Sequence, residues 1–229
     1  MKTLKILIII VFTLQLGLKL QAQEIKFGFL SGLVVANARV ANKIEIYNDY
    51  RVFYPMVSFN LNGYIEYKIS KTFGIAIEPG FIRKGGVVRY GVNHYMSVIK
   101  LQLNYIQLPI LVNLYCTNKF YVSLGPEFAY LINSNKNLPE TATGFYYFKE
   151  NAFEISGLIG LNYSISNKFD IGFRYNHGFA NISVLKWTDG YGPEIGQSKV
   201  YNQYFQFIFR FKIQTAANNN SKHNQTGSD

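Results

Sequence analysis

The sequence predicts an all-β protein, an eight-stranded antiparallel up-and-down transmembrane β-barrel. Apolar and polar residues alternate with a period of two along most of the chain, as strands require. The alternating runs are about 10 to 15 residues long, and a tilted strand needs roughly 9–11 to cross a bilayer. Short and long connections follow one another in turn, which is the layout of bacterial outer-membrane barrels.

Residues 1–22 are expected to be a secretory signal peptide. Lys2 and Lys5 precede an apolar stretch over residues 6–18, and Ala22 is a small residue at the expected cleavage point. The alternative is an uncleaved membrane anchor. The apolar stretch is about 13 residues long, however, and a spanning helix needs roughly 20, which favours the signal peptide.

The mature chain repeats weakly, and each repeat is expected to form one β-hairpin. Phe27, Phe73, Phe120 and Phe169 each lie at the start of a strand-like run, 46, 47 and 49 residues apart. Four hairpins make eight strands. The barrel domain is expected over residues 23–213, and the polar residues 214–229 are expected to form a disordered periplasmic tail.

Five expected strands alternate clearly, with aromatic and aliphatic residues on one face and Asn, Ser, Gly and charged residues on the other: 57–70, 120–132, 153–165, 169–179 and 201–213. The other three, near 24–36, 73–83 and 101–115, are less regular. Residues 101–115 are apolar on both faces, as in a core strand.

The connections alternate in length. Short ones are expected at 70–72, 116–119 and 166–168, and long ones at about 37–55, 84–100, 133–152 and 180–199. In bacterial outer-membrane barrels the short turns face the periplasm and the long loops face outward. Both termini are therefore expected in the periplasm.

A soluble lipocalin-like barrel or a β-sandwich is the alternative fold. In that case the apolar face would point inward and the polar face would meet water. Crowded barrel interiors need small residues, whereas solvent faces rarely do. Eight glycines have the parity of the polar face, which favours the membrane barrel: Gly28, Gly32, Gly74, Gly80, Gly125, Gly160, Gly172 and Gly178.

By the same parity, ten charged residues are expected inside the barrel: Lys26, Glu66, Lys68, Glu78, Glu127, Glu154, Asp170, Arg174, Arg210 and Lys212. Five are acids and five are bases, which favours a structural network of ion pairs over a catalytic carboxylate pair or a cation site. An eight-stranded barrel is just wide enough for side chains to fill it, so an open porin channel is not expected. Since no metal-ligand spacing, phosphate loop or dinucleotide motif is present, we expect no cofactor and no metal.

The second expected long loop is basic. It contains Arg83, Lys84, Arg89 and Lys100 and no acidic residue between positions 83 and 100. One hypothesis is that these cations contact the phosphates of lipopolysaccharide. The alternative is a solvated loop whose cations have no specific partner.

The net charge points to the same partners. Residues 1–22 hold three of the 23 basic residues and none of the 13 acidic ones, so the net charge of the mature chain falls from +10 to +7. An exported basic protein meets anionic lipid and sugar phosphates. We therefore expect outer-membrane lipid and lipopolysaccharide as partners, no nucleic acid, and a monomeric barrel.

His177 is the only histidine within an expected strand, and its parity places it on the lipid face near the outer interface. Outer-membrane lipid A deacylases place a histidine and a serine on one strand at about this depth. Here Gly178 and Phe179 follow and supply no nucleophile, which a Ser–His hydrolase requires within hydrogen-bond reach. An enzyme that modifies lipid A is therefore the weakest of the functional alternatives.

Residues 103–112 (LNYIQLPILV) resemble the central strand of the PorT-like outer-membrane β-barrel proteins of Bacteroidetes. Residues 120–127 (FYVSLGPE) and 172–178 (GFRYNHG) fit the same family, and the Ala22-Gln23 site is similar to many exported proteins of that phylum. The resemblance covers residues 24–213. It departs at the end of the barrel, where a polar tail follows Phe211 instead of a terminal aromatic residue.

The resemblance implies an outer-membrane barrel and is specific for that fold, not for an activity. The leading prediction is a non-enzymatic barrel whose surface loops serve an envelope or binding role. Because the family takes its name from a component needed for type IX secretion, the second prediction is an accessory component of a secretion or envelope-assembly machine, with a protein partner.

Overall fold

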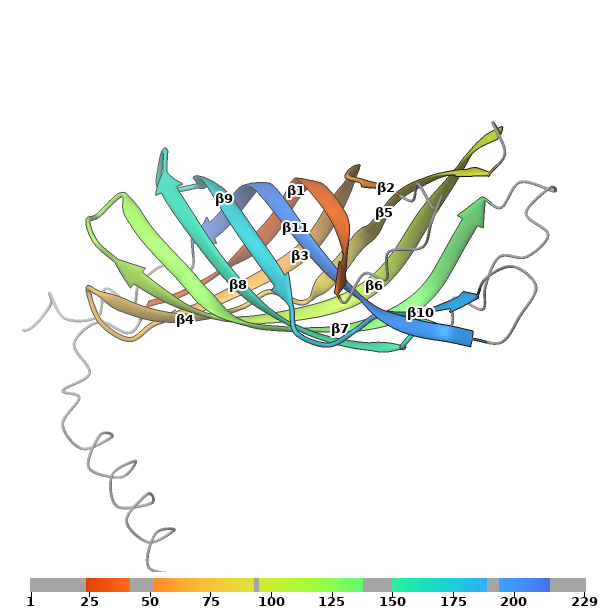
Figure 1. The fold of residues 1–229 in the computed structure, drawn as a ribbon. Coiled ribbons are helices and arrows are strands. Elements are labelled where there is room, and N and C mark those ends of the chain that lie inside the picture. Colours follow the sequence, from red (N-terminus) through yellow and green to blue (C-terminus); the bar gives the residue numbers. More distant parts are fainter. Residues whose placement is uncertain (1–23, 42–51, 93–94, 138–149, 189–193, 215–229) are drawn as a thin grey trace, which may run out of the picture.

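A computed structural model of the chain describes residues 24–41, 52–92, 95–137, 150–188 and 194–214 (Figure 1). The expected signal peptide and residues 215–229 of the expected tail lie outside the described residues. The described part of the chain has no helix with the length and apolarity needed to span a membrane.

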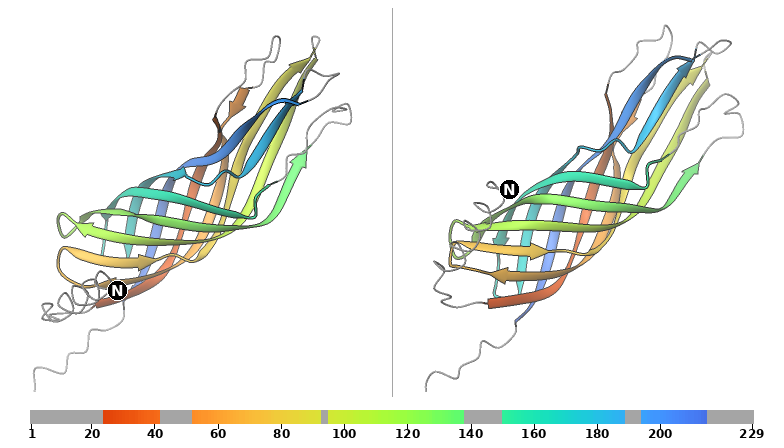
Figure 2. Two further views of the ribbon diagram at one scale, coloured as in Figure 1. Left: turned by 60° about the horizontal axis from the view of Figure 1, so that its bottom comes forward. Right: turned by 90° about the horizontal axis from the view of Figure 1, so that it is seen from below.

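The described residues form eleven strands in a single antiparallel sheet (Figures 1 and 2). In chain order they are β1 (Glu24–Ala41), β2 (Val52–Tyr54), β3 (Met56–Lys68), β4 (Phe73–Ile77), β5 (Gly80–Val92), β6 (Tyr95–Tyr115), β7 (Phe120–Asn137), β8 (Phe153–Ser164), β9 (Phe169–Gly178), β10 (Ser183–Thr188) and β11 (Glu194–Gln214).

The sheet closes on itself because β1 pairs with both β11 and β3. Around the ring the order is β1, β3, then β4 and β5 in one position, and then β6, β7, β8, β9 and β11. β4 and β5 are two parts of one strand, since both pair with β3 and with β6. In the same way β2 continues β3 along β5, and β10 continues β9 along β11. The ring therefore has eight strands, which confirms the predicted barrel.

The interruption between β4 and β5 lies at Glu78 and Pro79. Proline has no amide hydrogen for the ladder, and here its carbonyl instead accepts a bond from the amide of Gly63 at 2.8 Å. The register is the same on both sides, because Ile77 pairs with Ile110 and Gly80 pairs with Gln107. The inward and outward parity of β4 therefore continues through β5.

Side chains alternate across the barrel wall, with the apolar ones outside. Along β8, Phe153 and Ile159 are more than half exposed, whereas Glu154 and Ser156 between them are buried. The same pattern runs along β11, where Phe209 is exposed and Arg210 is fully buried. This is the arrangement of a barrel surrounded by hydrocarbon and the reverse of that of a soluble barrel.

The strands continue further into the expected long loops than predicted. Residues 84–100 were expected to form a loop, but β5 runs to Val92 and β6 begins at Tyr95, and the two strands stay paired up to these residues. The prediction ended each strand at the length needed to cross a bilayer, whereas the backbone ladder continues because residues 87–90 and 95–99 are rich in strand-favouring Val, Ile and Tyr. In Figure 1 this hairpin extends past the rest of the barrel, as do the ends of β7 and β10.

Candidate functional site

The lumen of the barrel holds the charged residues singled out by the sequence. Lys26 and Lys68 are partly exposed and line a cavity at the short-turn end of the barrel. The other eight are buried: Glu66, Glu78, Glu127, Glu154, Asp170, Arg174, Arg210 and Lys212. They form three groups, which differ in how the negative charge is balanced.

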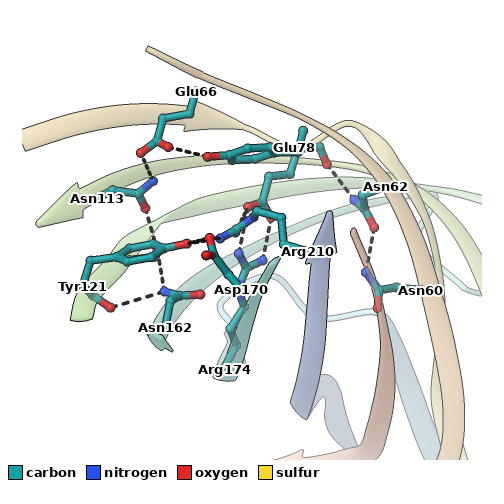
Figure 3. A network of polar contacts seen from close by, with 12 residues as sticks. Asn60, Asn62, Glu66, Glu78, Asn113, Tyr121, Asn162, Asp170, Arg174 and Arg210 are labelled. Carbon is teal, nitrogen blue, oxygen red and sulfur yellow. Dashed lines mark hydrogen bonds and ion pairs between the residues drawn. The ribbon is translucent and has the colours of Figure 1, made fainter. Parts of the chain in front are cut away.

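The first group is a chain of alternating charges across the middle of the lumen (Figure 3). Arg174 Nη1 and Nη2 donate to the two oxygens of Glu78 at 2.5 and 2.8 Å, and Arg210 Nη2 donates to Glu78 Oε1 at 2.8 Å. Arg210 also lies 3.5 Å from Asp170, whose other oxygen accepts from Lys212 Nζ at 2.7 Å. The chain connects β9 and β11 to the opposite wall at the β4–β5 interruption.

The second group surrounds Lys84. Its amine contacts Glu127 Oε1 at 2.8 Å and Glu154 Oε1 at 3.1 Å, and all three side chains are completely buried. The remaining carboxylate oxygens accept from Tyr204 Oη at 2.5 Å and from Asn202 Nδ2 at 2.7 Å. One amine therefore balances two carboxylates with the help of neutral donors.

The prediction that Lys84 lies in an outer, anion-contacting loop is wrong. Because the register is unbroken at Pro79, Gly80, Ile82 and Lys84 keep the inward parity of β4. Two buried glutamates across the lumen offset the cost of burying the amine. The sequence contained the necessary signal, since the alternation that places Glu78 inside also reaches Lys84.

In the third group, neutral donors surround a carboxylate. The carboxylate of Glu66 accepts hydrogen bonds from the hydroxyls of Tyr64 and Tyr115 and from Asn113 Nδ2, the last at 2.7 Å. The guanidinium of Arg210 stacks 4.5 Å above the ring of Tyr64. Tyrosines thus complete a network that the sequence-based list of charged residues does not contain.

The half of the lumen further from the short turns has an apolar cluster packed around the Lys84 group, whose amine lies over the rings of Tyr105 and Tyr204. Its members come from β1, β5, β6, β7, the β9–β10 connection and β11: Val34, Ala36, Ala38, Ile82, Leu101, Leu103, Tyr105, Ala129, Ile182, Val200 and Tyr204. This explains the irregular alternation of residues 24–36 and 101–115. Since Val34, Ile82, Leu103 and Tyr105 have no solvent-exposed surface, no water-filled channel passes along these described side chains.

Two of the remaining cations expected to contact anions lie on the outside of the barrel wall. Arg83 Nε donates to Asn104 Oδ1 at 2.8 Å, and its guanidinium carbon lies 5.5 Å from the ring centre of Phe59. Lys100 is exposed on β6. The backbone of Arg89 belongs to β5, but its side chain lies outside what the structure describes.

Two further outward cations were not singled out by the sequence. Arg39 on β1 packs its guanidinium 4.7 Å above the ring of Tyr201, and Lys199 on β11 is exposed. They lie on neighbouring strands, where Arg39 pairs with Tyr201 and Ala41 pairs with Lys199. Only closure of the barrel brings these first and last strands together.

His177 lies on the outer wall, as its parity indicated. Its Nδ1 is 3.0 Å from the hydroxyl of Tyr175, and its ring packs 5.7 Å from that of Phe179. Within the described ranges, no three His, Cys, Asp or Glu side chains are grouped so as to hold a metal ion.

Several solved structures are similar to this chain over most of its length. Among solved structures, OprG of Pseudomonas aeruginosa is similar, with 13% identity, coverage of 84% of this chain and 96% of that chain, and a TM-score of 0.49. Ail of Yersinia pestis has 12% identity, coverage of 83% and 99%, and a TM-score of 0.43. Neisserial surface protein A has 15% identity, coverage of 82% and 97%, and a TM-score of 0.45.

A search of curated proteins found no match. Residues 21–184 match the protein family described as outer membrane protein beta-barrel domain. This match covers well over half of the chain and agrees with the closed ring of eight strands and its apolar exterior. The chain therefore belongs to the outer membrane protein beta-barrel domain family and is an outer-membrane protein.

Proposed function

We propose that this protein is a closed, non-enzymatic outer-membrane barrel that binds the anionic groups of lipopolysaccharide through cations on its outer wall. The observation on which the proposal rests is the position of Arg39, Arg83, Lys100 and Lys199. On each of their strands the outward-facing residues form an apolar stripe. The cation lies past the end of this stripe that is further from the short turns.

The apolar stripes of β6 and β11 show this most clearly. On β6 the outward residues from Ile106 to Leu114 are apolar, and Asn104, Gln102 and Lys100 follow. On β11 the outward residues from Phe205 to Ile213 are apolar, and Gln203, Tyr201 and Lys199 follow. Each stripe has the length that a tilted strand needs to cross a bilayer, roughly 9–11 residues. Lys100 and Lys199 therefore lie just beyond the hydrocarbon.

The outward faces of β5 and β1 also change from apolar residues to a cation. Arg83 follows the outward Phe81, and Arg39 follows the outward Val35 and Asn37. The outward faces of these four strands carry no acidic side chain among the residues that the structure describes. Cations just beyond the hydrocarbon meet the phosphates of the outer leaflet. Each contributes about 1 kcal/mol of binding free energy near an anionic membrane surface.

The filled lumen supports a role outside the barrel. A channel would leave the side chains along its path in contact with water, but Val34, Ile82, Leu103 and Tyr105 have no solvent-exposed surface. Lys84, Arg174, Arg210 and Lys212 engage four of the buried carboxylates: Glu78, Glu127, Glu154 and Asp170. This supports a structural rather than a catalytic role. No described contact favours an accessory role in a secretion machine over lipopolysaccharide binding. A stable partner co-purifying after mild detergent extraction would support that alternative.

Binding of purified lipopolysaccharide to the protein in detergent tests the proposal. We expect Lys100→Ser with Lys199→Ser to weaken binding roughly tenfold or more at low salt, since two phosphate contacts are lost. The matched control is Lys71→Ser with Lys168→Ser, which removes the same charge from exposed positions at the short-turn end. Equal affinity of the two double variants would contradict the proposal.

A further inference from the structure

A cavity of about 230 Å³ lies at the short-turn end of the lumen, on the far side of the ion-pair chain from the apolar half. Its wall includes the beginning of β1, the end of β3, the β6–β7 and β8–β9 turns and the end of β11. The charged residues of this wall are Lys26, Glu66, Lys68, Lys119, Asp170 and Lys212. By the layout of the family, this end faces the periplasm.

The two carboxylates of the cavity are already engaged within the wall (Figure 3). Asp170 accepts from Lys212 Nζ at 2.7 Å and from Tyr121 Oη at 2.8 Å, with Arg210 behind it at 3.5 Å. Glu66 accepts from Asn113 and two tyrosine hydroxyls. The lining therefore has four lysines and two carboxylates, a net charge of +2.

The lysines come from different directions. Lys68 Nζ lies 4.3 Å above the ring of Tyr115, and Lys119 is exposed in the β6–β7 turn. Lys26 comes from β1 on the neighbouring wall, where it pairs in register with Glu66. Lysines act as point charges that bind phosphate from several sides. The rim also carries Asn118 and Ser166, whose side chains can donate to phosphate oxygens.

We propose that this cavity binds a phosphate-bearing anion on the periplasmic side of the outer membrane. The cavity is smaller than pockets for drug-sized ligands, which are roughly 300–1,000 Å³, so it takes a phosphate or diphosphate group rather than a whole lipid. The phosphate belongs either to a soluble anion or to the headgroup of a phospholipid. This site lies at the opposite end of the barrel from the cations proposed to bind lipopolysaccharide. The binding tests of the two sites are therefore independent of each other.

Titration of the full-length protein in uncharged detergent with pyrophosphate, followed by calorimetry, tests for the site. We expect saturable binding that Lys26→Gln with Lys119→Gln weakens roughly tenfold or more, since charge-assisted hydrogen bonds are lost. Lys71→Gln with Lys168→Gln removes the same charge from exposed residues at the same end that do not line the cavity, and it should leave binding unchanged. Lys119→Gln alone, in an exposed turn, keeps the test valid if the double variant does not fold.

A second arm separates the two sources of phosphate. Protein extracted from phosphatidylcholine nanodiscs containing phosphatidylglycerol is examined by native mass spectrometry for retained lipid. Retention of phosphatidylglycerol that depends on Lys26 and Lys119 supports a headgroup ligand, and lysine-dependent binding of pyrophosphate without retained lipid supports a soluble anion. Absence of binding in both arms, or equal binding by the two double variants, would overturn the proposal.

Discussion

Glu66 and Glu78 are both buried in the same lumen, but their carboxylates are balanced by different partners. Glu78 receives three hydrogen bonds from the guanidinium groups of Arg174 and Arg210. Glu66 receives its hydrogen bonds from two tyrosines and one asparagine, none of them charged. Neutralising Glu78 therefore leaves two buried cations without part of their counter-charge, whereas neutralising Glu66 changes the acceptor of three neutral donors.

The contrast predicts different losses of stability for the same substitution. Removing one partner of a buried ion pair costs about 3–5 kcal/mol. We expect Glu78→Gln to lower the free energy of unfolding by about 3 kcal/mol and Glu66→Gln by about 1 kcal/mol, the usual value of a hydrogen bond between neutral groups. Urea unfolding of the barrel in lipid vesicles measures both values. Equal losses would mean that the ion pairs of Glu78 contribute no more than neutral hydrogen bonds.

At the scale of strands, alternation was sufficient to predict the ring and most of its inner face. It placed Arg174 and Arg210 in the lumen from runs that alternate clearly, and Glu78 by the parity of the less regular run 73–83. It failed at Lys84, because residues 84–100 were assigned to a long loop whose cations have no acidic residue among them. It also could not predict which partners meet, since Arg210 and Glu78 are 132 residues apart and only closure of the ring brings them together.

Gly85 shows why β5 can continue past the point where a loop was expected. Its φ of 126° is one that side-chain-bearing residues rarely adopt, and an added Cβ would lie 2.1 Å from the carbonyl oxygen of Leu101. The glycine thus lets β5 approach β6 closely, next to the buried Lys84. Gly63 on β3 differs, because its Cβ would meet nothing nearer than Pro79 O at 3.7 Å.

We therefore expect Gly85→Ala to lower the free energy of unfolding by about 1–3 kcal/mol, the usual cost of one strained backbone conformation. Gly63→Ala should leave stability unchanged or raise it by a few tenths of a kcal/mol, because alanine restricts the unfolded chain. The same urea unfolding measurement compares the two variants. A Gly85→Ala protein as stable as the Gly63→Ala protein would show that the backbone at this position relaxes without cost.

For the whole molecule, the order of layers along the barrel gives each end a different character. The short-turn end has the basic cavity, the middle has the ion-pair chain, and the far half has the apolar cluster packed around Lys84 and its two glutamates. Outside the barrel, the apolar stripes end at Arg39, Arg83, Lys100 and Lys199. Both proposed sites depend on which end faces the periplasm, because lipopolysaccharide lies only in the outer leaflet.

Cys116 can report this orientation directly, because it is the single cysteine of the chain and is exposed in the β6–β7 turn. We expect a membrane-impermeant maleimide to leave it unlabelled in intact cells and to label it once the outer membrane is permeabilised. The control is Lys100→Cys in a Cys116→Ser background, which places the thiol at an exposed position beyond the apolar stripe and should be labelled in intact cells. The opposite pattern would reverse the barrel, moving Lys100 and Lys199 into the periplasm, away from lipopolysaccharide, and the cavity to the cell surface.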